Sequence, residues 1–146
     1  MRTKPAVTDT IEGYCKLLGG APVDVVTAAR RFGMHLVDDK RMSVTFTPRD
    51  SAFASGTAVR RWGTNDLSGI DLDVEPASKL TFSKLRDAFG PFKSVRRMHP
   101  GDDYEFSAAW PLGVAKAACR IVVTLRAQTE HPTGNELVQR VSIARP

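Results

Sequence analysis

The sequence predicts an α+β protein in which one antiparallel sheet carries helices on one of its faces. Apolar residues recur at helical spacing in three short segments and alternate with polar residues in at least six others. The order of these segments also repeats: one helix ends in Phe32-Gly33 and a second in Phe89-Gly90, 57 positions later. We therefore predict a tandem repeat of helix-plus-three-strand modules, residues 1–76 and 77–146, which together form one compact domain.

The bulk composition is that of a globular protein. The chain has 146 residues, 42% of them hydrophobic and 25% charged, and no apolar run approaches the ~20 residues that a membrane-spanning helix needs. The N-terminus shows no apolar segment of the signal-peptide type, so we expect no signal peptide. The default location is then the cytoplasm, or a secreted or periplasmic one if a leader has been removed.

Two helices are expected in the first 33 residues. Asp9 and Glu12 resemble a capping box, and Gly19-Gly20 ends the helix that follows. Pro22 suits the first turn of the second helix. After this helix the period changes to two. Residues 34–37 are expected only to begin a strand, and the three strands of the module are expected over 43–47, 57–64 and 70–75, with a loop at 48–56.

The second half repeats this order. Thr81 is the expected N-cap of a helix at about 81–89, and strands are expected over 104–110, 118–127 and 137–144. Arg145 shares the apolar parity of the last strand but is expected to reach solvent. The predicted core consists of Ile11, Leu18, Val26, Phe32, Val44, Phe46, Ile70, Leu72, Leu85, Phe89, Phe106, Ile121, Val123, Leu125, Val141 and Ile143.

The two cysteines, Cys15 and Cys119, are too few for a disulfide scaffold and both lie in apolar patterns. We interpret them as two buried thiols that act as small hydrophobic residues. A single bridge between the halves is the alternative, and a catalytic thiolate is a more remote one.

Charge is distributed unevenly between the halves. Residues 1–76 hold ten Lys and Arg and ten Asp and Glu, whereas residues 77–146 hold eleven and six, so the net charge of +5 belongs to the second half. Such an excess suits an acidic protein or a polyanion, but it also provides ordinary solubility. Because the first half is neutral, nucleic acid is an unlikely partner.

One local feature supports a family resemblance. A helix that ends in Leu-Arg-Asp-Ala-Phe-Gly-Pro91 and precedes an antiparallel meander is similar to the unit of the β-lactamase-inhibitor-protein fold. The same unit occurs once in small outer-membrane lipoproteins of the SmpA/OmlA type, although this chain has no lipobox cysteine. The resemblance implies a curved sheet with helices on its convex side and a concave face for a protein partner. It implies no particular functional residue.

Catalytic and ligand-binding motifs are not found. The chain lacks G-x-S-x-G, a P-loop, G-x-G-x-x-G and paired C-x-x-C motifs. His99, Asp102 and Asp103 could ligate a metal, but Pro100-Gly101 makes a solvated turn the better interpretation. We expect no metal, no cofactor and no catalytic residue.

The expected function is therefore binding of a protein partner, as a non-enzymatic module of inhibitor or toxin-immunity type. Acidic residues of the third strand and Arg120, Arg126 and Arg140 are expected to form stripes of opposite sign on the exposed sheet face. The predicted partner-binding residues are Arg60, Trp62, Asp71, Asp73, Arg120 and Arg126. A ligand-binding or catalytic pocket between helices and sheet is the alternative, and a regulatory or nucleic-acid-associated domain is a third hypothesis. The sequence does not indicate the oligomeric state.

Overall fold

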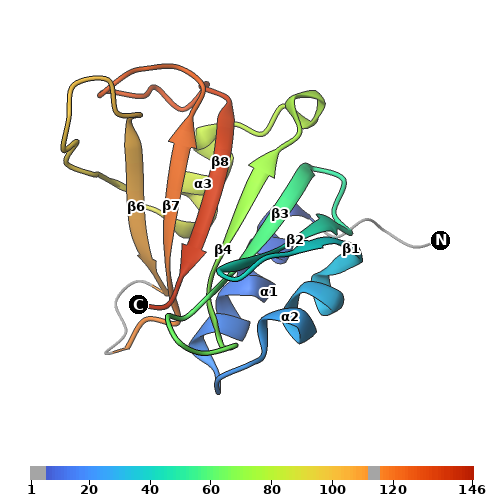
Figure 1. The fold of residues 1–146 in the computed structure, drawn as a ribbon. Helices are drawn as coiled ribbons and strands as arrows, with labels where there is room; N and C mark the ends of the chain where they lie inside the picture. The colour runs from blue at the N-terminus through green and yellow to red at the C-terminus, as the bar shows by residue number, and fades with distance from the viewer. Residues whose placement is uncertain (1–5, 112–115) are drawn as a thin grey trace.

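The computed structural model of the protein describes residues 6–111 and 116–146. These residues form three α-helices, one short 3-10 helix and one antiparallel sheet of eight strands (Figure 1), which confirms the prediction of an α+β protein. None of the helices in the described residues is long and apolar enough to cross a bilayer. The elements are α1 (Val7–Gly19), α2 (Val25–Phe32), β1 (Gly33–Asp39), β2 (Ser43–Pro48), β3 (Phe53–Arg60), β4 (Leu67–Val74), η1 (Pro76–Ser78), α3 (Phe82–Phe89), β5 (Lys93–Ser94), β6 (Glu105–Trp110), β7 (Cys119–Leu125) and β8 (Val138–Ala144).

The strand order in the sheet is β1-β2-β3-β4-β8-β7-β6-β5. In the described residues, the first half of the chain runs as two α-helices followed by four antiparallel strands, and the second as the 3-10 helix, one α-helix and four strands. The last strands of the two halves, β4 and β8, meet in the centre of the sheet. The prediction of three strands per half is wrong. β1 is a full strand rather than the start of one, and the sequence pattern gave no sign of the two-residue strand β5, which pairs with β6.

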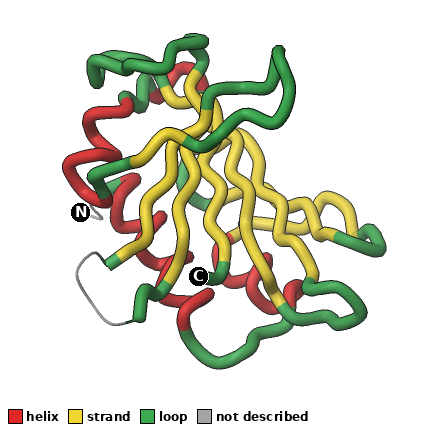
Figure 2. Tube along the Cα trace, turned by 90° about the vertical axis from the view of Figure 1, so that its left-hand side faces the viewer, coloured by secondary structure: helices red, strands yellow, loops and turns green. Residues whose placement is uncertain are grey.

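Two rows of small or apolar residues cross the sheet on the face that the helices cover. The first row is Val44, Ala58, Ile70, Ile143, Ile121 and Ala108, and the second is Phe46, Gly56, Leu72, Val141, Val123 and Phe106. Helix α1 contacts β4, β7 and β8, α2 contacts β1 to β3, and α3 contacts β6. In Figure 2 the helices lie to the left of and below the strands, and the upper right side of the sheet carries no helix.

The predicted core is largely correct. All of its members are buried except Val26 and Phe32, which are partly exposed and pack against the core. Both lie on α2, a helix of eight residues at the edge of the helical layer. The ring of Phe32 rests on that of Tyr14 in α1, with 4.2 Å between their centroids. Burial, together with the nearby Asp50 carboxylate, raises the pKa of the Tyr14 hydroxyl.

The helix starts differ from the prediction. Helix α1 begins at Val7 after Ala6, without a side-chain cap, so the predicted capping box of Asp9 is wrong. Helix α2 begins only at Val25, and Asp24 is its N-cap: the carboxylate accepts hydrogen bonds from Val26 N at 3.0 Å and Thr27 N at 3.2 Å. Pro22 therefore lies before the helix, because the better capping residue sets where the first turn begins.

Cys15 and Cys119 are joined in a disulfide, so the interpretation as two free thiols is wrong. Both residues are fully buried, and the bond connects α1 to the start of β7 across 104 positions of sequence. Packing is close here, because a Cβ on Gly19 would lie 2.8 Å from Ala118. The disulfide thus fixes the N-terminal helix to the second half of the sheet.

Arg145 provides a second connection between α1 and the sheet. Its guanidinium donates to Leu18 O at 2.5 Å and to Leu67 O at 3.0 Å, rather than reaching solvent as predicted. A cation at the C-terminal end of a helix is favourable, because the last carbonyl groups there have no partner within the helix. Arg145 therefore connects α1 to the centre of the sheet.

The start of α3 is closed by the turn before β8. The backbone N–H groups of Phe82 and Ser83 donate to the carbonyls of Glu136 and Gly134, and Thr81 occupies the N-cap position without capping through its side chain. Hydrogen bonds from the backbone of Thr133, of Glu136 itself and of Gly134 lower the pKa of the Glu136 carboxyl from 4.5 to about 2.

Candidate functional site

The face of the sheet opposite the helices, here called the open face, is the candidate site. Its side chains are mostly small or hydroxylated, and many are half-buried although no helix covers them. The row across its middle is Thr45, Thr57, Asp71, Ser142, Val122, Ser107 and Lys93. Such a surface lets another molecule approach the backbone closely and offers hydroxyl groups for hydrogen bonds.

Two predicted residues, Asp71 and Asp73, lie at the centre of this face. Asp73 accepts a hydrogen bond from Ser55 Oγ at 2.9 Å and pairs with Arg140, whose Nε is 3.1 Å from Asp73 Oδ1. The predicted acidic and basic stripes therefore meet in an ion pair across β4 and β8. Asp71 lies between Thr57 and Ser142, is half-buried, and has no hydrogen-bond or ion-pair partner among the described residues.

Arg120 lies on the open face at the start of β7, opposite Ala109 of β6. It lines a pocket of about 420 Å³ together with Pro91, Lys93, Ser107, Ala108, Ala109 and Pro146. Neither Lys93 nor Arg120 has a hydrogen-bond or ion-pair partner in the described part of the chain. This end of the open face therefore carries two positive charges that form no ion pair with the described residues.

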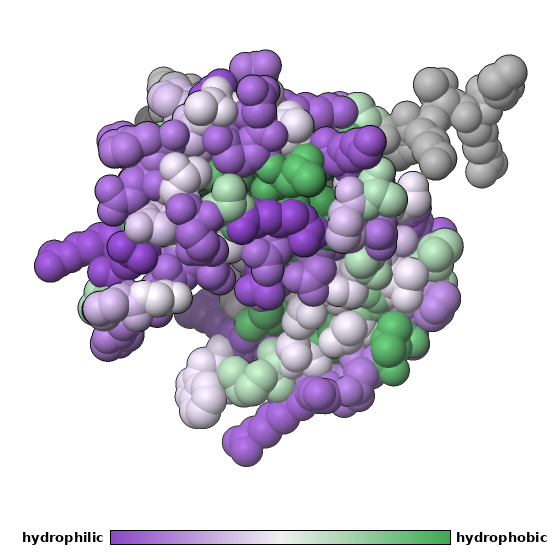
Figure 3. All heavy atoms as spheres, turned by 90° about the horizontal axis from the view of Figure 1, so that it is seen from above, coloured by the Kyte–Doolittle hydropathy of each residue, from purple (hydrophilic) through white to green (hydrophobic). Residues whose placement is uncertain are grey.

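The loop between β5 and β6 borders the face at another edge. A pocket of about 340 Å³ lies beneath it and is lined by charged residues of both signs, including Arg96, Arg140 and Glu105. Arg97 covers the ring of Tyr104, with its Cζ 4.0 Å from the ring centroid. Seen from above, hydrophilic side chains gather over this end of the molecule, and the surface is hollowed between them and the paler side chains below them in the picture (Figure 3).

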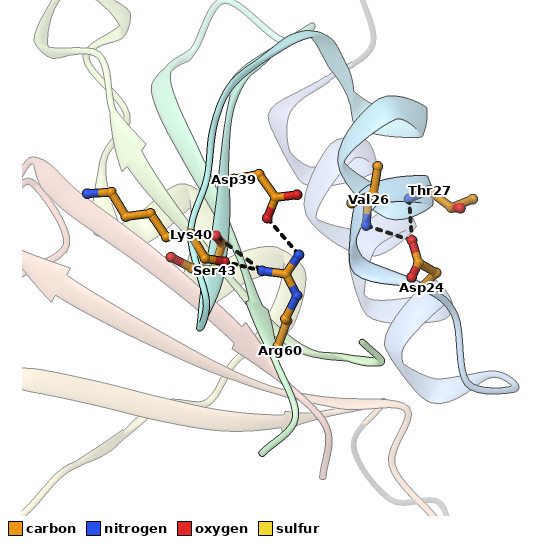
Figure 4. A network of polar contacts seen from close by, with 7 residues as sticks. All are labelled: Asp24, Val26, Thr27, Asp39, Lys40, Ser43 and Arg60. Atoms are coloured by element: carbon orange, nitrogen blue, oxygen red, sulfur yellow. Dashed lines mark hydrogen bonds and ion pairs between the residues drawn. The ribbon is translucent and has the colours of Figure 1, made fainter. Parts of the chain in front are cut away.

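Arg60 was predicted on the open face, but the structure places it elsewhere. It has the parity of the buried Ala58, and its guanidinium turns to the β1–β2 turn (Figure 4). There it pairs with Asp39 at 2.7 Å and donates to the carbonyls of Lys40 and Ser43. The side chain of Arg60 is only 12% exposed, because it packs against the β1–β2 turn. It therefore contributes no binding surface to the open face.

Trp62 and Arg126 also lie outside the rows of the sheet. The strand predicted over 57–64 is in fact Phe53–Arg60, so Trp62 lies in the turn that follows and is 79% exposed. Arg126 follows the end of β7 and donates to Val74 O at 3.3 Å. Of the six predicted residues, the open face thus brings together three: Asp71, Asp73 and Arg120.

The prediction missed the small residues of the face and the pocket partner Lys93. The alternation of Thr45 and Thr47 with Val44 and Phe46 marked the hydroxyl side of β2. Lys93 had no such signal, because β5 is only two residues long.

The predicted turn at 99–103 is closed by Asp102, whose Oδ2 accepts from His99 N at 2.9 Å. In the described ranges, no three His, Cys, Asp or Glu side chains cluster in a way that could hold a metal ion. Comparison of the chain with models of protein families, with curated proteins and with solved structures finds no match.

Proposed function

We propose that the protein is a non-enzymatic binding module, of inhibitor or toxin-immunity type, whose open face contacts a protein partner. The observation that carries this proposal is that all three α-helices pack on one face of the sheet. The other face carries the half-buried carboxylate of Asp71 at its centre and the cations Lys93 and Arg120 at one end, none of which pairs with a residue that the structure describes. Charges arranged in this way orient a partner and reject those with the wrong sign.

A bulky side chain in the middle of the open face tests the proposal. Ser142→Arg fills the space between Asp71 and Val122, whereas the control Thr27→Arg places the same group on the exposed side of α2. A protein captured from the source cell by the native chain is expected to be retained by the Thr27 variant and lost by the Ser142 variant. Both variants should keep the native melting temperature. Equal capture by both would exclude the open face.

We further propose that the two halves derive from one duplicated unit, as in the β-lactamase-inhibitor-protein fold. The support is that in each half an α-helix, α2 or α3, leads directly into four antiparallel strands, and that the halves meet at β4 and β8; α1 has no counterpart in the second half. If the boundary at residues 76 and 77 separates two units, the segments 1–76 and 77–146 co-expressed as separate chains should reassociate. Failure of the two chains to copurify would contradict the division.

The compartment in which the protein acts is proposed from the disulfide. Bonds of this kind persist in oxidising surroundings, whereas cytosolic thiols are kept reduced. We therefore propose an oxidising compartment such as the periplasm or the extracellular space. Source cells lysed directly into denaturant with an alkylating reagent test this, because a bonded pair takes up no reagent and two reduced cysteines take up two equivalents.

A further inference from the structure

The pocket at the β5–β7 end of the open face has the composition of an anion site. Lys93 is paired with Ser107, and Arg120 with Ala109, so the two cations flank β6 on the same face of the sheet. Neighbouring strands lie about 5 Å apart, and long side chains on either side of one strand therefore reach over the same small area. The Ser107 hydroxyl between them adds a hydrogen-bond donor.

The other residues that line the pocket indicate which chemical group can be attached to the bound anion. Pro91 and Ala109 give the pocket apolar walls, none of the described side chains that line it is acidic, and its volume is about 420 Å³. A carboxylate matches the paired cations, since a planar group with two oxygens accepts from a guanidinium and an ammonium together. The apolar walls suit a short aliphatic group attached to it.

We propose that this pocket binds a carboxylate carried on a short aliphatic group. The carboxylate oxygens accept from Arg120 and Lys93, and the aliphatic part rests on Pro91 and Ala109. A free small acid and an acidic side chain of another protein share this chemistry. This proposal does not depend on the proposed protein-binding function, because it is tested by the affinity of the pocket for small probes.

The test is an NMR titration of the native chain with four probes: butyrate, acetate, methyl butyrate and the blocked peptide acetyl-Ala-Glu-Ala-amide. We expect shifts at the amides of Ser107 and Ala109 with butyrate, weaker ones with acetate and none with the uncharged ester. A stronger response to the peptide than to butyrate would assign the carboxylate to a protein, and the reverse would assign it to a free acid.

The binding affinities of variants distinguish a specific site from non-specific attraction of the anion to the positively charged protein. Arg120→Gln and Lys93→Gln are each expected to weaken binding about tenfold, as the loss of one charge-assisted hydrogen bond does. Arg61→Gln, which removes an exposed cation from the first half, should leave it unchanged, and Ala109→Glu should abolish it by placing a carboxylate beside Arg120. The proposal is overturned if neither butyrate nor the peptide binds, if the ester binds as well as the acid, or if the Arg61 variant weakens binding as much as the Arg120 variant. Melting temperatures of all variants control for folding.

Discussion

Asp73 and Arg140 join the two halves of the sheet at its centre: Arg140 Nε lies 3.1 Å from Asp73 Oδ1 across the β4–β8 pair. Both side chains are about half exposed, at 53% and 48%. An ion pair in such a position is well screened by water and adds little to stability. Its position on the open face instead makes it available to a partner.

The first prediction concerns this pair. Asp73→Asn and Arg140→Gln should each lower the free energy of unfolding by less than about 1 kcal/mol, because exposed pairs rarely contribute more. Urea unfolding of both single variants and of the double variant gives the coupling energy. A coupling above about 2 kcal/mol would contradict the interpretation of this pair as solvent-screened.

The second prediction concerns Gly56, which lies beneath the ring of Phe46. A Cβ at position 56 would lie 2.5 Å from Phe46 Cζ, so Gly56→Ala should destabilise the protein by about 1–3 kcal/mol through overpacking. Gly20→Ala is the matched control, since a Cβ there meets nothing closer than 3.5 Å. Phe46→Leu should recover part of the loss when combined with Gly56→Ala. If the loss is equal with and without Phe46, the cause lies elsewhere.

This packing also shows why part of the first half was predicted incorrectly. Two inward positions of β3, Gly56 and Ala58, are small, and the ring of Phe46 fills the space above Gly56, whereas Val59 points to the open face. With small residues inward and Val59 outward, apolar side chains do not mark the buried side of this strand, and Arg60 was expected on the wrong face. The strands β4, β6, β7 and β8 were predictable, because large apolar residues alternate along each of them.

Other features depend on contacts between residues far apart in the chain. The pairing of Cys15 with Cys119 and the bonds from Arg145 to Leu18 follow from how α1 crosses the sheet, and no local pattern encodes them. No local pattern indicates either that Lys93 and Arg120 line the same pocket. Asp71 and Asp73 were placed correctly on the exposed side because their strand alternates clearly.

The third prediction concerns pH. The pKa of Glu136 is about 2 in the folded protein and near the ordinary value of 4.5 when unfolded, so the folded state favours the carboxylate. Its contribution to stability is therefore complete above pH 4.5 and is lost as the pH falls from there toward 2. Glu136→Gln should be less stable than the native chain at pH 7, and the difference should shrink toward pH 2. Melting temperatures of both proteins from pH 7 to 2 test this, and a difference independent of pH would contradict it.

The fourth prediction concerns the disulfide. Replacing Cys15 and Cys119 by serine opens a loop of 104 residues, and the unfolded chain gains entropy that corresponds to about 4–5 kcal/mol. Two hydroxyl groups in a fully buried site add to the loss. Urea unfolding of this variant and of a Cys15→Ala, Cys119→Ala variant separates the two effects, because alanine adds no polar group. Unchanged stability of the alanine variant would show that the cross-link does not constrain the unfolded chain.

The position of β8 has a consequence for synthesis. This strand spans Val138–Ala144 yet lies in the middle of the sheet, between β4 and β7. During translation, the first half can form its four strands early, but β4 then remains an unpaired edge until residue 144 has left the ribosome. Edge strands of this kind invite pairing with other chains. The nascent protein therefore carries β4 as an exposed edge until β8 has emerged, and a ribosome stalled before residue 138 would leave β4 exposed.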